Sequence, residues 1–132
     1  MKYTPFGYQM NAKGPDKSDL MPGTLVLIVL RILDALGPLH GYAIARRIEQ
    51  VSDKLLQVNQ GTLYPALLHM QQEGWITSRW RTSESNRRAK FYSITGAGRK
   101  QLAKETGDWQ RMSSTIERFL GSLQDLSGEE VS

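Results

Sequence analysis

The chain has 132 residues, of which 39% are hydrophobic and 23% charged, and it carries a net charge of +4. This composition predicts one folded domain and excludes a disordered chain; the most apolar stretch, Leu20–Leu36, is short for a bilayer of roughly 30 Å and contains three interrupting residues, Pro22, Arg31 and Asp34. The lack of cysteine excludes a disulfide framework, a thiolate nucleophile and a zinc–thiolate site, and it suits a cytoplasmic protein. The short apolar stretch also predicts that the protein has no membrane partner.

The first residues contain glycine and proline but no apolar periodicity, so we expect residues 1–19 to form a flexible arm. Apolar residues then recur at helical spacing from Leu25 to Leu36, until Gly37-Pro38, which predicts a first helix over about 22–35. A second, shorter helix is expected over 41–51, with apolar residues on one stripe and basic residues turned outward. The apolar run 55–58 is too short for a helix, and we predict a short strand there.

A third helix is predicted to begin near Thr62, whose side chain is a suitable N-cap. Leu63, Leu67 and Met70 occupy successive turns on one face, so this face should pack on the core. Gly74 is placed to cap the C-terminal end, and the helix should therefore stop just before it.

A basic hairpin follows the third helix. Alternating residues predict antiparallel strands over 76–82 and 89–94, joined by the turn-rich segment 83–88. Five basic residues and one acidic residue, Glu84, lie between Trp75 and Ile94, so this stretch accounts for the whole net charge of the chain. The excess charge is therefore local, as a surface that binds a polyanion requires, although a solvated basic loop would show the same pattern.

A last helix is expected from Thr95, which acts as its N-cap, to about Ser122. Two apolar series repeat every seven residues within it and form a seam of the kind that packs against another helix. Gly107 weakens the helix by about 1 kcal/mol relative to alanine, so a long uniform coiled coil is not expected. We interpret it as the docking helix of a homodimer, with the interface residues Leu102, Trp109, Met112, Ile116, Phe119 and Leu123.

The order of these elements is helix, helix, short strand, helix, hairpin and long helix, which is the order of a winged helix-turn-helix. The predicted fold class is therefore mainly α with a small β hairpin, a winged helix-turn-helix with a long C-terminal dimerisation helix. Its predicted parts are a DNA-binding domain over 20–95, the dimerisation helix over 96–124 and a tail over 125–132. In such a fold one helix fits the major groove of B-DNA, and the hairpin places cations against phosphates.

Several segments carry a resemblance to a known family. The runs Gly61–Leu67, Glu73–Ile76 and Arg87–Thr95, together with His40-Gly41-Tyr42, are similar to PadR-type regulators, with the spacing kept from about Leu20 to Leu120. The resemblance implies a bacterial repressor whose C-terminal helix packs on its mate and on the N-terminal helix in a homodimer. The chain departs from the family pattern at Arg81 and at Ser85-Asn86, where wings of this kind often have glycines.

Contacts to DNA are expected from the third helix and from the hairpin. Thr62 and Tyr64 lie near the helix N-terminus, where phosphates bind readily, whereas half-buried packing is the alternative role for Tyr64. The charge gathered in the hairpin has little other use than phosphate binding. The expected DNA-binding residues are Gln60, Thr62, Tyr64, His69, Arg87, Arg88 and Lys90.

Trp109 has two interpretations. Small members of the family carry an aromatic residue at a similar position that lines a pocket in the dimer interface, so the resemblance implies a small planar hydrophobic effector. Ordinary interface packing is the favoured interpretation, because a large aromatic side chain stabilises a dimer through its contact area alone.

The predicted function is a sequence-specific transcriptional regulator that binds a pseudo-palindromic operator in double-stranded DNA as a homodimer. The alternative is a winged-helix module that binds protein partners without reading DNA, and the localised charge favours DNA. The sequence shows no nucleophile with a base, no paired catalytic carboxylates and no metal-ligand cluster. We therefore expect a protein that is not an enzyme and needs no cofactor or metal.

Overall fold

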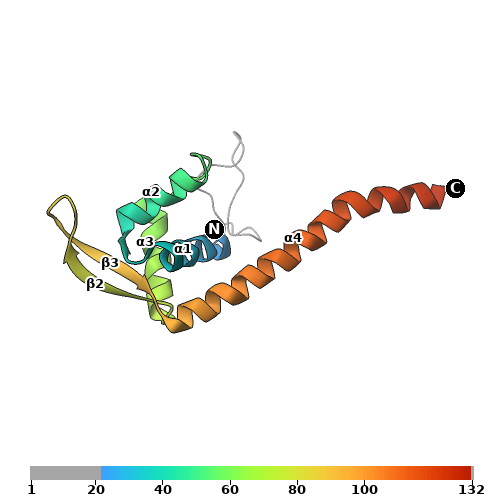
Figure 1. The fold of residues 1–132 in the computed structure, drawn as a ribbon. Coiled ribbons are helices and arrows are strands. Elements are labelled where there is room, and N and C mark those ends of the chain that lie inside the picture. Colours follow the sequence, from blue (N-terminus) through green and yellow to red (C-terminus); the bar gives the residue numbers. More distant parts are fainter. Residues whose placement is uncertain (1–21, 132) are drawn as a thin grey trace, which may run out of the picture.

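The fold was analysed in a computed structural model, which describes the backbone of residues 22–131 and the side chains of residues 23–121. The arm expected over residues 1–19 and the side chain of Leu123 lie outside the described residues. The elements follow one another as α1 (Pro22–Leu36), β1 (Leu39–His40), α2 (Gly41–Val51), α3 (Gln60–Gln72), β2 (Ile76–Thr82), β3 (Arg88–Ile94) and α4 (Gly96–Val131). Figure 1 shows the β2–β3 hairpin and α4 projecting in opposite directions from a body formed by the three shorter helices.

The helices begin and end where side chains and glycines satisfy their terminal groups. Gly37 and Gly74 adopt positive φ angles of 84° and 81°, and they end α1 and α3 as their positions predicted. The predicted cap of α3 is wrong by three residues, because Asn59 and not Thr62 is the N-cap. The Asn59 side-chain oxygen accepts a hydrogen bond from the backbone N–H of Thr62 at 2.9 Å, so Thr62 lies within the first turn.

The sheet has three antiparallel strands in the order β1-β3-β2. The hairpin was predicted, whereas the short strand β1, which pairs Leu39 with Tyr92 and His40 with Phe91, was not. The strand predicted over 55–58 is wrong: this segment is an irregular connection that enters α3. It follows two residues with positive φ, Asp53 and Lys54, and contributes the buried side chain of Val58 without pairing to the sheet.

One hydrophobic core joins α1, α2, α3 and the sheet. It contains the apolar stripe of each helix and one face of the hairpin root, and the predicted α3 residues Leu63, Leu67 and Met70 are fully buried. The molecule is mainly helical with a small sheet, as predicted. Within the described residues, no helix combines the length and the apolar character that crossing a membrane would require.

The long helix α4 begins on the body and then leaves it (Figure 1). Its first turns pack on α1, where Arg99 Nε donates a hydrogen bond to Asp34 Oδ1 at 3.1 Å. Leu102 is only 9% exposed and belongs to the protomer's own core, so little of its side chain is left for the predicted dimer seam. The helix continues to Val131, past the end predicted near Ser122, because isolated glycines weaken a helix without ending it.

Candidate nucleic-acid interface

Helix α3 has one face in the core and one face in solvent. Leu63, Leu67 and Met70 anchor the inner face. Tyr64 and Leu68, one turn apart, are 49% and 58% exposed. Because the anchored face fixes the rotation of the helix about its axis, the exposed face is the only part of α3 that can meet a ligand.

Tyr64 is packed on one side and exposed on the other. A Cβ atom at Gly41 would lie 3.2 Å from the Tyr64 hydroxyl, so the ring covers the first residue of α2. Burial, and to a lesser extent the neighbouring Tyr64, raises the pKa of the Tyr92 hydroxyl above its usual value. One side of Tyr64 therefore packs on the start of α2, while about half of its surface remains open to solvent.

The remaining sequence-predicted residues of α3 differ in their surroundings. Gln60 and Thr62 are half-buried in the first turn, and the side-chain oxygen of Gln60 is buried without a hydrogen-bond partner in the described part of the chain. His69 is exposed near the other end of α3, where its ring lies edge-on to Trp75 with centroids 5.6 Å apart. Gln60, Thr62 and Tyr64 thus lie near the N-terminal end of α3, and His69 lies near its C-terminal end.

The hairpin, here called the wing (residues 76–94), closes through a tight loop without glycine. Ser83 N–H donates to the Arg87 carbonyl at 2.7 Å, and Asn86 N–H donates to the Ser83 carbonyl at 2.9 Å. Asn86 takes a φ of 64°, a conformation that asparagine tolerates better than most residues. The departure from a glycine-containing wing is therefore accommodated by Asn86.

The wing's cations are free to bind an anion. Arg79, Arg81, Arg87 and Arg88 are exposed and Lys90 is half-buried, and no ion pair within the described residues includes any of them. Two guanidinium groups lie over aromatic rings instead: Arg81 is 4.6 Å from the Phe91 centroid, and Arg88 is 5.6 Å from the Trp80 centroid. These contacts orient the side chains without neutralising their charge.

One face of the wing packs on the helical body at its root and becomes exposed further out. Trp80 and Lys90 are paired across the strands and share the sheet face of Ile76 and Tyr92, which pack on the helical body at the root of the wing. Trp80 is more than half exposed at this position. Trp80 was not among the residues that the sequence analysis expected to bind DNA, although its alternation with Arg79 and Arg81 was visible.

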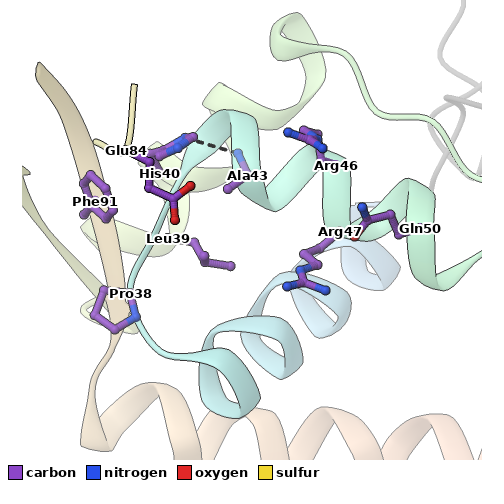
Figure 2. A pocket seen from close by; sticks show the side chains of 9 residues that line it. All are labelled: Pro38, Leu39, His40, Ala43, Arg46, Arg47, Gln50, Glu84 and Phe91. Carbon is purple, nitrogen blue, oxygen red and sulfur yellow. Dashed lines mark hydrogen bonds between the residues drawn. The ribbon is translucent and has the colours of Figure 1, made fainter. Parts of the chain in front are cut away.

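Helix α2 extends the basic surface. Figure 2 shows a hollow of about 350 Å³ between α2 and the sheet, with Arg46 and Arg47 on its α2 side and Phe91 on its sheet side. His40 Nδ1 accepts a hydrogen bond from Ala43 N–H at 3.2 Å and so caps α2. Tyr42, which sequence reasoning also omitted, is exposed beside His40 and lies under the Arg46 guanidinium.

A second exposed feature lies on α4, away from the wing. The side chains of Trp109, Met112, Ile116 and Phe119 are each about half exposed or more, and the neighbouring Leu120 joins them. We call these five residues the α4 stripe. Trp109 and Met112 also line a hollow with the start of α1, including Leu27. No group of three or more potential metal ligands occurs within the described residues.

Comparisons with known proteins match this chain over most of its length. A family model described as the transcriptional regulator PadR-like family matches residues 29–104. A transcriptional regulator from Clostridium thermocellum has 29% sequence identity and a TM-score of 0.69, and the match covers 77% of this chain and 98% of that one. A PadR-like transcriptional regulator from Bacillus cereus has 28% identity and a TM-score of 0.65, with 75% and 93% covered. An uncharacterised protein from Lysinibacillus sphaericus is 24% identical over 108 residues, which are 82% of this chain and 98% of that protein.

Proposed function

Since this chain belongs to the PadR-like family of transcriptional regulators, we propose that it is a repressor that binds a pseudo-palindromic operator as a homodimer. The family assignment establishes a DNA-binding regulator and not an enzyme, in agreement with the sequence analysis. Repression, the two-fold symmetry of the operator and the surfaces that bind DNA and the second protomer are proposed in addition. Acting on chromosomal DNA would place the protein in the cytoplasm.

The observation that carries the proposal is the position of α3 beside a basic wing whose cations form no ion pair within the described residues. The exposed face of α3 is of a size that enters the major groove, where the four base pairs present different patterns. The cations of the wing, led by Arg87, Arg88 and Lys90, would then lie against the phosphates next to the same groove. Gln60, Thr62 and Tyr64 would contact DNA at the N-terminal end of α3.

The second half of the proposal is that the α4 stripe forms the dimer interface. Five large apolar side chains on one projecting helix expose a continuous surface that water solvates poorly, and a second copy of the helix would cover it. Two-fold symmetry of the protein would then require a two-fold related pair of half-sites in the operator.

Trp109 would serve this interface by packing. A small planar hydrophobic effector would enter at the hollow between Trp109 and the start of α1, where bound ligand would alter the contact between α4 and the body. Such a ligand would change DNA affinity by shifting the relative position of the two α3 helices that contact the half-sites.

Sequencing of genomic fragments that the purified protein protects tests the proposal. The expected result is a small set of sites with an inverted repeat, and a reporter placed behind such a site should be silenced when the protein is expressed. Fragments without a shared sequence would contradict sequence-specific binding. A shared sequence without symmetry would contradict the homodimer, and an activated reporter would contradict repression.

A further inference from the structure

Leu68 stands out on the exposed face of α3. Leu67 and Leu68 are neighbours in the chain, yet Leu67 is fully buried while Leu68 is 58% exposed. The two side chains point to different sides because successive residues of a helix are about 100° apart. Leu68 follows Tyr64 by one turn, so it shares the side of α3 that is open to solvent.

An isolated exposed leucine needs no explanation on an ordinary surface. Its place on α3 gives it a consequence, because a helix in the major groove presses its exposed side chains against base edges. A leucine side chain cannot form hydrogen bonds. It would therefore displace water from the polar edge of whichever base it meets without replacing the hydrogen bonds that the base made to water.

Thymine is the base that lessens this cost. Its 5-methyl group is the apolar feature of the major-groove edges, whereas guanine, cytosine and adenine present donors and acceptors there. Contact between leucine and the methyl group buries apolar surface of both the protein and the base. Contact between leucine and another base leaves a donor or acceptor of that base without a hydrogen-bond partner. Leu68 would therefore select thymine through attraction to the methyl group and through the cost of the alternatives.

The occupant of this apolar position is DNA and not a protein partner, as the charge around it indicates. The wing beside α3 carries cations that no acidic side chain neutralises within the described residues, which suits a polyanion. The apolar surface suited to a second protein copy is the separate α4 stripe.

We propose that Leu68 contacts the 5-methyl group of a thymine in each half-site of the operator. Leu68 thereby contributes to the sequence specificity of DNA binding. The inference rests on the proposed function, since it requires α3 to enter the major groove.

Replacement of thymine by deoxyuridine tests this contact at the level of one methyl group. The duplex tested is a synthetic copy of a protected fragment, in which each thymine of a half-site and its symmetry mate are replaced in turn. Deoxyuridine keeps base pairing and every hydrogen-bonding group. For the wild-type protein we expect one symmetric pair of thymines whose replacement weakens binding about fourfold per half-site, the effect of one buried methyl group.

The variants assign the effect to Leu68. L68A should bind the thymine duplex more weakly than the wild type and should bind the thymine and deoxyuridine duplexes equally at the sensitive pair. L36A is the matched control, since Leu36 is an exposed leucine at the end of α1, and it should keep the wild-type preference. Circular dichroism of L68A should match the wild type because the side chain is outside the core.

The outcomes separate this inference from the proposed function. A bound operator whose affinity is unchanged by deoxyuridine at every position overturns the Leu68 contact and leaves the operator proposal intact. The same holds if L68A retains the full preference for thymine, because another residue would then read the methyl group. Failure to recover any specific DNA overturns both.

Discussion

The hydroxyl of Thr95 donates a hydrogen bond to the backbone carbonyl of Gly74 at 2.6 Å. The same oxygen accepts a hydrogen bond from the backbone N–H of Gly98 at 2.9 Å. One side chain thus closes the root of the wing, since it joins the glycine that ends α3 to the first turn of α4. The wing and the long helix are held to the same point of the body.

We expect T95V to lower the free energy of unfolding by about 1–2 kcal/mol, because the carbonyl of Gly74 and the N–H of Gly98 both lose their partner. Urea unfolding at neutral pH measures this change. T95S is the control and should lose much less, because serine keeps the hydroxyl. Equal stability of T95V and the wild type would show that water replaces both hydrogen bonds.

Two glycines at the start of α4 should respond oppositely to alanine. A Cβ atom at Gly98 would lie 2.1 Å from the backbone carbonyl oxygen of Trp75, so the backbone must shift. We expect G98A to lower the free energy of unfolding by about 1–3 kcal/mol, the usual range for overpacking. G96A meets nothing within 4 Å and should be neutral or slightly stabilising in the same urea unfolding experiment. If the two variants unfold alike, the close approach of Gly98 to Trp75 is wrong.

Tyr92 should make the protein sensitive to alkaline pH. Burial raises the pKa of its hydroxyl in the folded state above the unfolded value of 10.0, so the folded protein holds this proton more tightly. The stability from this group is complete below pH 10 and is lost as the pH rises through the folded-state pKa. Urea unfolding between pH 8 and 11 should show a steeper fall for the wild type than for Y92F. Parallel curves would contradict the shift.

The sequence was sufficient for the elements that follow a single periodicity. The stripe of Leu63, Leu67 and Met70 predicted both the existence and the buried face of α3, because helical spacing is a local property. The two long strands were predicted for the same reason. Thr95 alone was also sufficient to predict the start of α4, since its hydroxyl caps this helix.

The errors occurred where a distant partner decides the structure. Leu39-His40 forms a strand only because β3 offers it an edge, and the run 55–58 forms none because no strand lies beside it. Leu102 fits the seven-residue spacing of the seam, yet its side chain is buried in the core of its own protomer. Periodicity identifies an apolar face, but it does not say which surface will cover that face.

Charge drew attention to the wing, whereas several exposed aromatic and apolar residues in it and beside it were not among the predicted contacts. Arg87, Arg88 and Lys90 were identified by the concentration of positive charge in the wing. Tyr42, Leu68 and Trp80 carry no charge, and their exposure depends on how α2, α3 and the wing pack together. Only the fold shows that these residues remain at the surface.

Arg88 should contribute to the salt dependence of DNA binding. Its guanidinium lies over Trp80 and keeps its full charge, so it can displace a counterion from one phosphate. We expect R88A to lower the slope of log affinity against log salt by about one unit. Binding titrations between low and moderate salt measure this slope. K100A, which removes an exposed cation of α4, should leave the slope unchanged. A wild-type affinity that does not depend on salt would reject phosphate binding by the wing.

Ile116 lies in the middle of the α4 stripe and should be essential for dimer formation. The substitution I116D would place a carboxylate among Met112, Phe119 and their partner copies, and burial of an unpaired charge there would cost more than the apolar contacts return. We expect monomers in sedimentation experiments and loss of operator binding, because a monomer contacts one half-site only. S114D adds the same charge on another side of the exposed helix and should remain dimeric. Since Ile116 is outside the core, I116D should keep the wild-type helical content, and a folded I116D dimer would place the interface elsewhere.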